Sequence, residues 1–191
     1  MNNMITKLVE NLHKEELISE EDKIIYLFGL KELISLIINV FTIILIGIIF
    51  GELIGVMFFA ISFMTLRKYA GGYHAPTPVR CYMMTCTVLA GSAIVLKNID
   101  FSNGVIILGL CISAAIILIM SPVECKNKPL DSLEKKIYRK KALFIWGVGV
   151  VIAISCCWWF EVIIVTKSIM LANCILALSQ IGESVGKRNV Y

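Results

Sequence analysis

Residues 33–50 read LISLIINVFTIILIGIIF, an unbroken run without a charged side chain. As an α-helix this run would be about 27 Å long, close to the roughly 30 Å thickness of the hydrocarbon layer of a bilayer. Inside that layer the backbone must satisfy its own hydrogen bonds, and the run lacks the apolar–polar alternation of a barrel strand. It therefore predicts a transmembrane helix.

Five further apolar runs follow along the chain, separated by charges, glycines or prolines. They cover residues 53–66, 79–96, 104–120, 142–160 and 162–181. The composition agrees, because 58% of the 191 residues are hydrophobic, against about 45–50% in soluble domains. We therefore expect an all-α, polytopic membrane protein with about six transmembrane helices, forming a single domain over residues 1–191.

The N-terminal segment, residues 1–22, differs from these runs because charges of both signs are distributed through it. A cleavable signal peptide needs an apolar core at this place, so we expect none. The apolar residues of the segment recur at helical spacing: Met4, Ile5, Leu8, Val9 and Leu12. This pattern predicts an amphipathic helix lying on the inner surface of the membrane.

The positive charges indicate how the spans are oriented. If the N-terminus is cytoplasmic, all of the 18 Lys and Arg residues except Lys97 and Lys167 fall in cytoplasmic segments. The positive-inside rule then predicts a multi-pass protein of the cell membrane with both termini in the cytoplasm. The most basic segment, residues 122–141, is expected to be a cytosolic loop that attracts anionic lipids and acidic peptides.

Cysteine usage argues against a disulfide framework and against a zinc site. The chain has seven cysteines, an odd number, and none of them are in C-x-x-C spacing. Five lie inside apolar runs, where a free thiol packs as a small hydrophobic group: Cys86, Cys111, Cys156, Cys157 and Cys174. No metal or cofactor is expected.

The loop between the second and third runs, residues 67–81, reads RKYAGGYHAPTPVRC. It holds two of the four prolines, a pair of glycines and one of the two histidines. The run before it, residues 53–66, would be about 21 Å long as a helix and barely crosses the hydrocarbon layer. Irregular backbone drawn to that depth persists only where protein or a water-filled cavity surrounds it, which is typical of functional sites.

His74 and Cys81 are candidates for a catalytic base and its nucleophile, since a thiol needs a partner to become a reactive thiolate near neutral pH. On a continuous helix the two side chains would lie about 10 Å apart along the axis, beyond hydrogen-bonding distance. Pro76 and Pro78 exclude such a helix, and Gly71-Gly72 allow the chain to turn. The alternative is a plain hairpin in which His74 faces water and Cys81 only packs.

The residues just before Cys81 predict a helix start. Thr77 is suited to the N-cap and Pro78 to the first helical position, which puts Cys81 in or just after the first turn. Unpaired backbone N–H groups, the positive end of the helix dipole and the adjacent Arg80 would all stabilise a thiolate there. Arg67 marks the inner end of the second span and could also bind a carboxylate.

At this loop the sequence resembles the accessory gene regulator B (AgrB) family, membrane endopeptidases that process the propeptides of quorum-sensing signals. The matching residues are Arg67, Gly71-Gly72-Tyr73-His74-Ala75 and Cys81, with the six-residue gap between His and Cys that is typical of the family. Length, hydropathy and the basic segment before the fifth run agree as well, so the resemblance covers nearly the whole chain.

The resemblance implies that Cys81 is the nucleophile and His74 the general base of a cysteine endopeptidase. Such an enzyme cuts a short propeptide on the cytosolic side and then closes a thiolactone or lactone ring through a thioester. The residues expected to contact the substrate are Arg67, Gly71, Gly72 and Arg80. The expected partners are a propeptide with an acidic C-terminal tail and membrane lipids, but no nucleic acid, and a homodimer is left open.

Two non-enzymatic functions are also compatible with this composition. A small-solute carrier or peptide exporter needs little more than six spans and the intramembrane Lys167, and a scaffold could recruit partners through its basic inner loops. Against a carrier, the sequence has no evident inverted repeat with paired broken helices. Only an enzyme requires Cys81 to react faster than the other cysteines.

Overall fold

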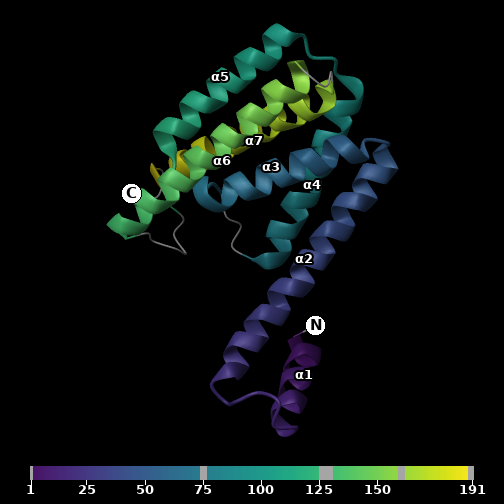
Figure 1. Cartoon of the computed structure of the whole chain (residues 1–191), viewed down its shortest axis with the longest axis vertical. Coiled ribbons are helices and arrows are strands. Elements are labelled where there is room, and N and C mark those ends of the chain that lie inside the picture. The colour runs from purple at the N-terminus through teal and green to yellow at the C-terminus, as the bar shows by residue number, and fades with distance from the viewer. Residues whose placement is uncertain (1, 74–76, 125–130, 159–161, 189–191) are drawn as a thin grey trace. The chain divides into compact units, whose positions relative to one another are not determined.

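The computed structural model in Figure 1 describes residues 2–73, 77–124, 131–158 and 162–188. The chain forms two compact units, residues 1–42 and 43–191. The helices of the described residues are α1 (Asn2–Lys14), α2 (Asp22–Phe50), α3 (Leu53–Ala70), α4 (Pro78–Asn98), α5 (Asn103–Met120), α6 (Ser132–Trp158) and α7 (Ile163–Arg188). Six of them, α2 to α7, are long and apolar enough to cross a membrane. The expected all-α, polytopic architecture is therefore confirmed.

In the first unit the N-terminal segment is helical, as its apolar spacing predicts. Helix α1 buries Ile5 and Val9. It ends at a turn in which His13 Nδ1 lies 3.0 Å from the carbonyl oxygen of Ile18, and His13 Nε2 lies 2.8 Å from a carboxylate oxygen of Glu20. His13 thus has two partners that hold this turn and is not simply solvated.

Helix α7 is the central helix of the second unit. Helices α3, α5 and α6 all pack against it, and Figure 1 shows α6 running alongside it. The most apolar 18-residue stretch of α7 is 61% buried inside the protein. The corresponding stretches of the other candidate spans among the described residues are 39% buried or less. The buried face of α7 carries polar side chains that lipid would not solvate: Thr166, Ser168, Asn173 and Gln180.

The apolar core of this unit lies where α3 meets its neighbours. Phe59 and Phe63 of α3 stack with their ring centroids 5.7 Å apart. They belong to one buried cluster with Leu66, with Ile117 of α5 and with Leu176 of α7. Many large apolar side chains on other helix faces are exposed, as expected for a protein whose outer surface contacts lipid.

Helix α3 extends further than its apolar run predicts. It continues past residue 66 to Ala70, so that Arg67 and Lys68 stand in its last turn. Positive side chains are favourable at a helix C-terminus, and their long stems can carry the charges towards water. Within residues 67–81, helix α3 therefore includes residues 67–70, and helix α4 begins at Pro78.

Helix α6 also starts earlier than expected, at Ser132, so residues 132–141 of the basic segment are helical. The start is stabilised locally, because the backbone N–H of Asp131 donates to a carboxylate oxygen of Glu134 at 3.2 Å, and Asp131 Oδ1 accepts from the N–H of Ser132 at 2.6 Å. The basic residues of this stretch consequently project from one rigid helix instead of a loop.

Lys167, which the sequence places inside the last span, has a specific partner. Its ammonium donates to Asp100, in the turn between α4 and α5, at 2.8 Å. The Lys167 side chain is 9% exposed, whereas that of Asp100 is fully exposed. The hydrogen bond from Lys167 and its positive charge lower the pKa of the Asp100 carboxyl from its ordinary 3.8. The pair should therefore persist above that pH and be lost only in stronger acid.

Asp100→Asn is expected to lower the melting temperature of the purified protein by several degrees, because the buried Lys167 side chain would lose its anionic partner. The double variant Asp100→Asn with Lys167→Met should regain most of this loss, since the apolar side chain needs no partner. Thermal unfolding in detergent at pH 7 measures both effects. An unchanged melting temperature in Asp100→Asn would mean that the pair adds nothing to stability.

Candidate active site

The chain leaves helix α3 in a conformation that requires glycine. Gly71 has a φ of 76°, and its N–H donates to the carbonyl oxygen of Arg67 at 3.0 Å. Gly71 also forms a parallel bridge with Val123, in the segment between α5 and α6, whose N–H donates to the carbonyl oxygen of Ala70 at 2.9 Å. A Cβ on Gly71 would collide with the carbonyl oxygen of Val123. Both the backbone angle and this close approach therefore favour glycine.

The next residue brings the loop against helix α7. Gly72 is buried with a φ of 146°, and a Cβ there would lie 2.6 Å from Ser179 Oγ. The sequence predicts that the glycine pair lets the chain turn. The structure confirms a turn and adds that the same pair allows close contact with α7 and with the segment before α6.

A buried amide that sequence patterns did not single out lies behind this turn. Gln180 of α7 is fully buried, and its Nε2 donates to the carbonyl oxygen of Ala70 at 2.9 Å and to Ser121 Oγ at 3.0 Å. These partners are 110 and 59 positions away in the sequence. The only signal for such a contact is the presence of an amide inside an apolar run.

Arg67 lies across the beginning of the loop. Its Nη2 donates to the carbonyl oxygen of Tyr73 at 2.5 Å, and its guanidinium carbon lies 5.6 Å from the centroid of the Phe63 ring. A guanidinium has five N–H donors, so this bond leaves others that could contact a carboxylate. In the free protein, Arg67 holds the loop where it leaves helix α3.

Helix α4 begins as its sequence predicts. Thr77 has the extended backbone of an N-cap, its Oγ1 accepts from the N–H of Arg80 at 3.3 Å, and Pro78 occupies the first turn. The N–H of Cys81 donates to the carbonyl oxygen of Thr77 at 3.0 Å. Cys81 is therefore the residue that closes the first helical turn, with its side chain half-buried.

The predicted site residues thus fall into two groups within the described part of the chain. Arg67, Gly71 and Gly72 lie together at the end of α3, and Arg80 and Cys81 lie at the start of α4. His74 lies outside the described residues. The pairing of His74 with Cys81 accordingly stays a prediction.

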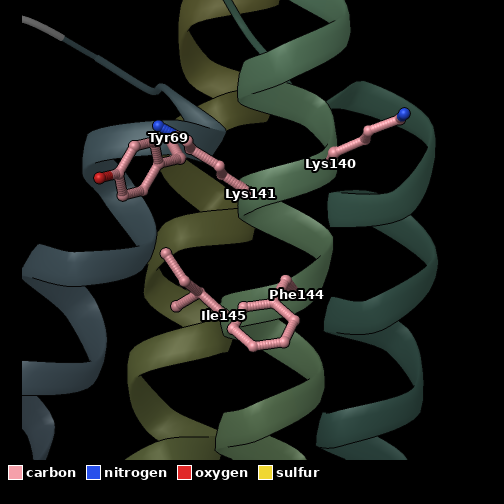
Figure 2. A pocket seen from close by; sticks show the side chains of 5 residues that line it. All are labelled: Tyr69, Lys140, Lys141, Phe144 and Ile145. Atoms are coloured by element: carbon pink, nitrogen blue, oxygen red, sulfur yellow. The ribbon is translucent and has the colours of Figure 1, made fainter.

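A pocket with a basic and aromatic rim lies beside the last turn of α3. It has a volume of about 310 Å³ and is lined by Tyr69 of α3 and by Lys140, Lys141, Phe144 and Ile145 of α6. Figure 2 shows Lys141 lying against the Tyr69 ring, and the distance from its Nζ to the ring centroid is 5.4 Å. Phe144 and Ile145 lie further along α6 and form an apolar floor.

Two other basic residues of α6 have partners in the protein. Lys135 Nζ lies 2.8 Å from a carboxylate oxygen of Glu124, and Arg139 donates to the carbonyl oxygen of Leu118 at 3.2 Å. From the sequence, the basic residues of this segment form a single group. The structure distinguishes those that hold α6 to its neighbours from Lys140 and Lys141, which line the pocket.

The cysteines of the described residues are free thiols: Cys81, Cys86, Cys111, Cys156, Cys157 and Cys174. Within the same part of the chain, no three His, Cys, Asp or Glu side chains are grouped so that they could hold a metal ion.

Comparisons with known proteins agree with the family resemblance seen in the sequence. The sequence model of the family described as Accessory gene regulator B matches residues 2–181. A Clostridium perfringens strain 13 protein with the provisional name AgrB-like protein 2 is 27% identical over 145 residues, covering 72% of this chain and 68% of its own. An AgrB-like protein of strain SM101, also provisionally named, is 26% identical over 188 residues and 86% of each chain. No solved structure matches the chain.

Proposed function

The chain belongs to the accessory gene regulator B family, and from this premise we propose that it is a membrane-embedded cysteine endopeptidase that processes the propeptide of a quorum-sensing signal. Membership of this family supports a role of the chain in processing a quorum-sensing peptide. The observation that carries the finer proposal is the position of Cys81. Its thiol is half-buried at the first turn of α4, after a loop whose beginning is held by α7 and by the segment before α6.

In the proposed reaction, His74 takes the proton of the Cys81 thiol, and the thiolate attacks the carbonyl carbon of the scissile peptide bond. His74 then gives the proton to the leaving amine as the C–N bond breaks. The N-terminal part of the propeptide stays on Cys81 as a thioester. A thiol or hydroxyl of the same peptide attacks this thioester, loses its proton to His74 and closes the ring, and the Cys81 thiolate leaves.

Ring closure rather than hydrolysis follows from the location of the site. A thioester held at the membrane on the half-buried side chain of Cys81 is less accessible to water than one on an exposed thiol. A nucleophile in the same peptide reaches an effective molarity of about 10⁵ M or more when it is well oriented. The tethered group therefore outcompetes water.

We propose that the acidic tail of the propeptide docks at the basic end of the bundle. Lys140 and Lys141 line the pocket, and the Nζ of Lys68 in α3 lies 5.8 Å from the ring centroid of Tyr69, which lines the same pocket. Arg67 is in the same turn of α3, with donors beyond the one used by the loop. If both termini are cytoplasmic, this end of the bundle faces the cytoplasm, where the propeptide is made.

The test uses a synthetic propeptide with an amphipathic N-terminal helix, a central cysteine and an acidic C-terminal tail. Protein reconstituted in vesicles is expected to release the tail, and changing the tail acids to Gln should slow release about tenfold at low salt. Rising salt should slow only the acidic peptide, since exposed charges are screened beyond about 8–10 Å at physiological ionic strength. Release is measured by mass spectrometry.

The double variant Lys140→Gln with Lys141→Gln should slow release of the acidic tail as much as the Gln-tailed peptide does. The matched control, Lys7→Gln with Lys14→Gln on α1, should release the tail at the normal rate. Equal rates for the acidic and Gln-tailed peptides at low salt would refute electrostatic docking and leave recognition to the N-terminal helix of the peptide. Failure to release the tail from either peptide would count against the endopeptidase itself.

A further inference from the structure

The segment that leads from helix α3 to His74 begins at Ala70. The carbonyl oxygen of Ala70 accepts two hydrogen bonds from distant parts of the chain. It accepts from the N–H of Val123 at 2.9 Å and from Nε2 of Gln180 at 2.9 Å. The same Nε2 donates to Ser121 Oγ at 3.0 Å. A single side chain of α7 thus joins the end of α3 to the segment between α5 and α6.

Three of the four residues that provide these groups are buried, and Val123 is half-buried. Gln180 and Ala70 are fully buried, and Ser121 is 3% exposed. Hydrogen bonds in such surroundings do not compete with water, so they hold the joined segments in one arrangement. The contacts of Gly71 with Val123 and of Gly72 with Ser179 reinforce that arrangement from the side of the loop.

The amide oxygen of Gln180 indicates that this side chain does more than fill space in the core. Its Oε1 is buried and accepts no hydrogen bond from the described residues. A buried acceptor without a partner destabilises a fold, so an apolar side chain of the same length would fill this space at less cost. The benefit of a glutamine here lies in what its Nε2 holds in place.

We propose that Gln180 is a positioning residue for the proposed reaction, fixing the point from which the loop presents His74 to Cys81. This inference rests on the proposed dyad. His74 is only two residues beyond Gly72, and two residues span at most about 7 Å. A shift of the turn at Ala70 is therefore passed directly to the base, and a misplacement of about 1 Å at a reacting group can cost on the order of 100-fold in rate.

The experiment measures how fast iodoacetamide alkylates Cys81 in the full-length protein in detergent at pH 7, read by mass spectrometry of the peptide that contains it. Gln180→Met keeps the length of the side chain and removes both hydrogen bonds. It should slow alkylation about five- to tenfold, whereas His74→Ala should slow it more. In the His74→Ala background, Gln180→Met should add no further slowing, because it acts through the base.

The matched control is Asn173→Leu. Asn173 is also a buried amide of α7 and lies seven residues before Gln180, on the same helix face. Its Nδ2 has no partner among the described residues, so this group donates no hydrogen bond to the end of α3 as the Nε2 of Gln180 does. This variant should leave the alkylation rate unchanged.

In peptide cleavage, Gln180→Met should lower kcat and leave KM nearly the same.

If Gln180→Met leaves Cys81 alkylation unchanged, or slows it equally with and without His74, the positioning role is overturned while the dyad stands. If His74→Ala itself does not slow alkylation, the dyad fails, and the proposed function with it. Should Gln180→Met not accumulate in membranes, Gln180→Leu replaces it, because this side chain also removes both hydrogen bonds and places no charge in the buried site. The same slowing is expected, and the same two results would overturn the role.

Discussion

Replacing Cys81 by alanine is expected to abolish release of the propeptide tail, a loss of about 10⁴-fold or more, because the nucleophile that forms the thioester is gone. His74→Ala should lose a similar factor. A nucleophile and its base act as one unit, so the double variant should be no worse than either single one. Tail release by protein reconstituted in vesicles, followed by mass spectrometry over several hours, measures all three.

The controls for this prediction are other cysteines. Cys86 is on the same helix as Cys81 and is equally half-buried, and Cys111 is an exposed residue of α5. Cys86→Ala and Cys111→Ala should cleave nearly as fast as the unaltered protein. Each variant is compared at equal amounts in the membrane, so that failed insertion is not mistaken for lost chemistry. Cleavage that survives in Cys81→Ala would rule out the thiol mechanism.

Gly71→Ala is expected to reduce cleavage on the order of 100-fold. The added methyl group would meet the carbonyl oxygen of Val123, and the φ of 76° is unfavourable for any residue with a Cβ. The turn must therefore move away from the segment before α6. Because the loop leaves helix α3 at this point, the base is displaced from the thiol.

The matched control is Gly91→Ala, in the middle of helix α4, where a Cβ would meet nothing within 4 Å. Alanine is favoured over glycine in a helix by about 1 kcal/mol, so this variant should be as stable as the unaltered protein or more so. Tail release and the melting temperature are measured for both variants. If Gly71→Ala cleaves at the normal rate, the position of this turn is unimportant for the reaction.

Features that depend on local sequence could be predicted. The apolar runs locate the six candidate spans found among the described residues, because a helix across lipid needs an uninterrupted apolar stretch. Thr77 and Pro78 mark the start of α4 through their own backbone and hydrogen-bonding preferences. The glycine pair at residues 71–72 likewise marks a turn, because glycine tolerates backbone angles that other residues avoid.

Features that depend on packing between distant helices could not be predicted. The apolar side chains of a run do not show which helix will be central, since lipid and protein interior favour the same residues. The contact of Gln180 with Ala70, and that of Lys167 with Asp100, join residues that are 110 and 67 positions apart. The division of the α6 basic residues into pocket-lining and pairing side chains has the same origin.

The central claim is that the propeptide becomes bound to Cys81 as a thioester, and a propeptide whose ring-forming cysteine is replaced by alanine tests it most directly. This peptide can be cut but cannot close the ring, so the acyl-enzyme should accumulate. Intact-mass spectrometry should show the protein heavier by the N-terminal part of the peptide less one water. The added mass should map to Cys81, disappear with neutral hydroxylamine and be absent in Cys81→Ala. Release of the tail without an adduct on Cys81, or with the adduct on another residue, would contradict the account.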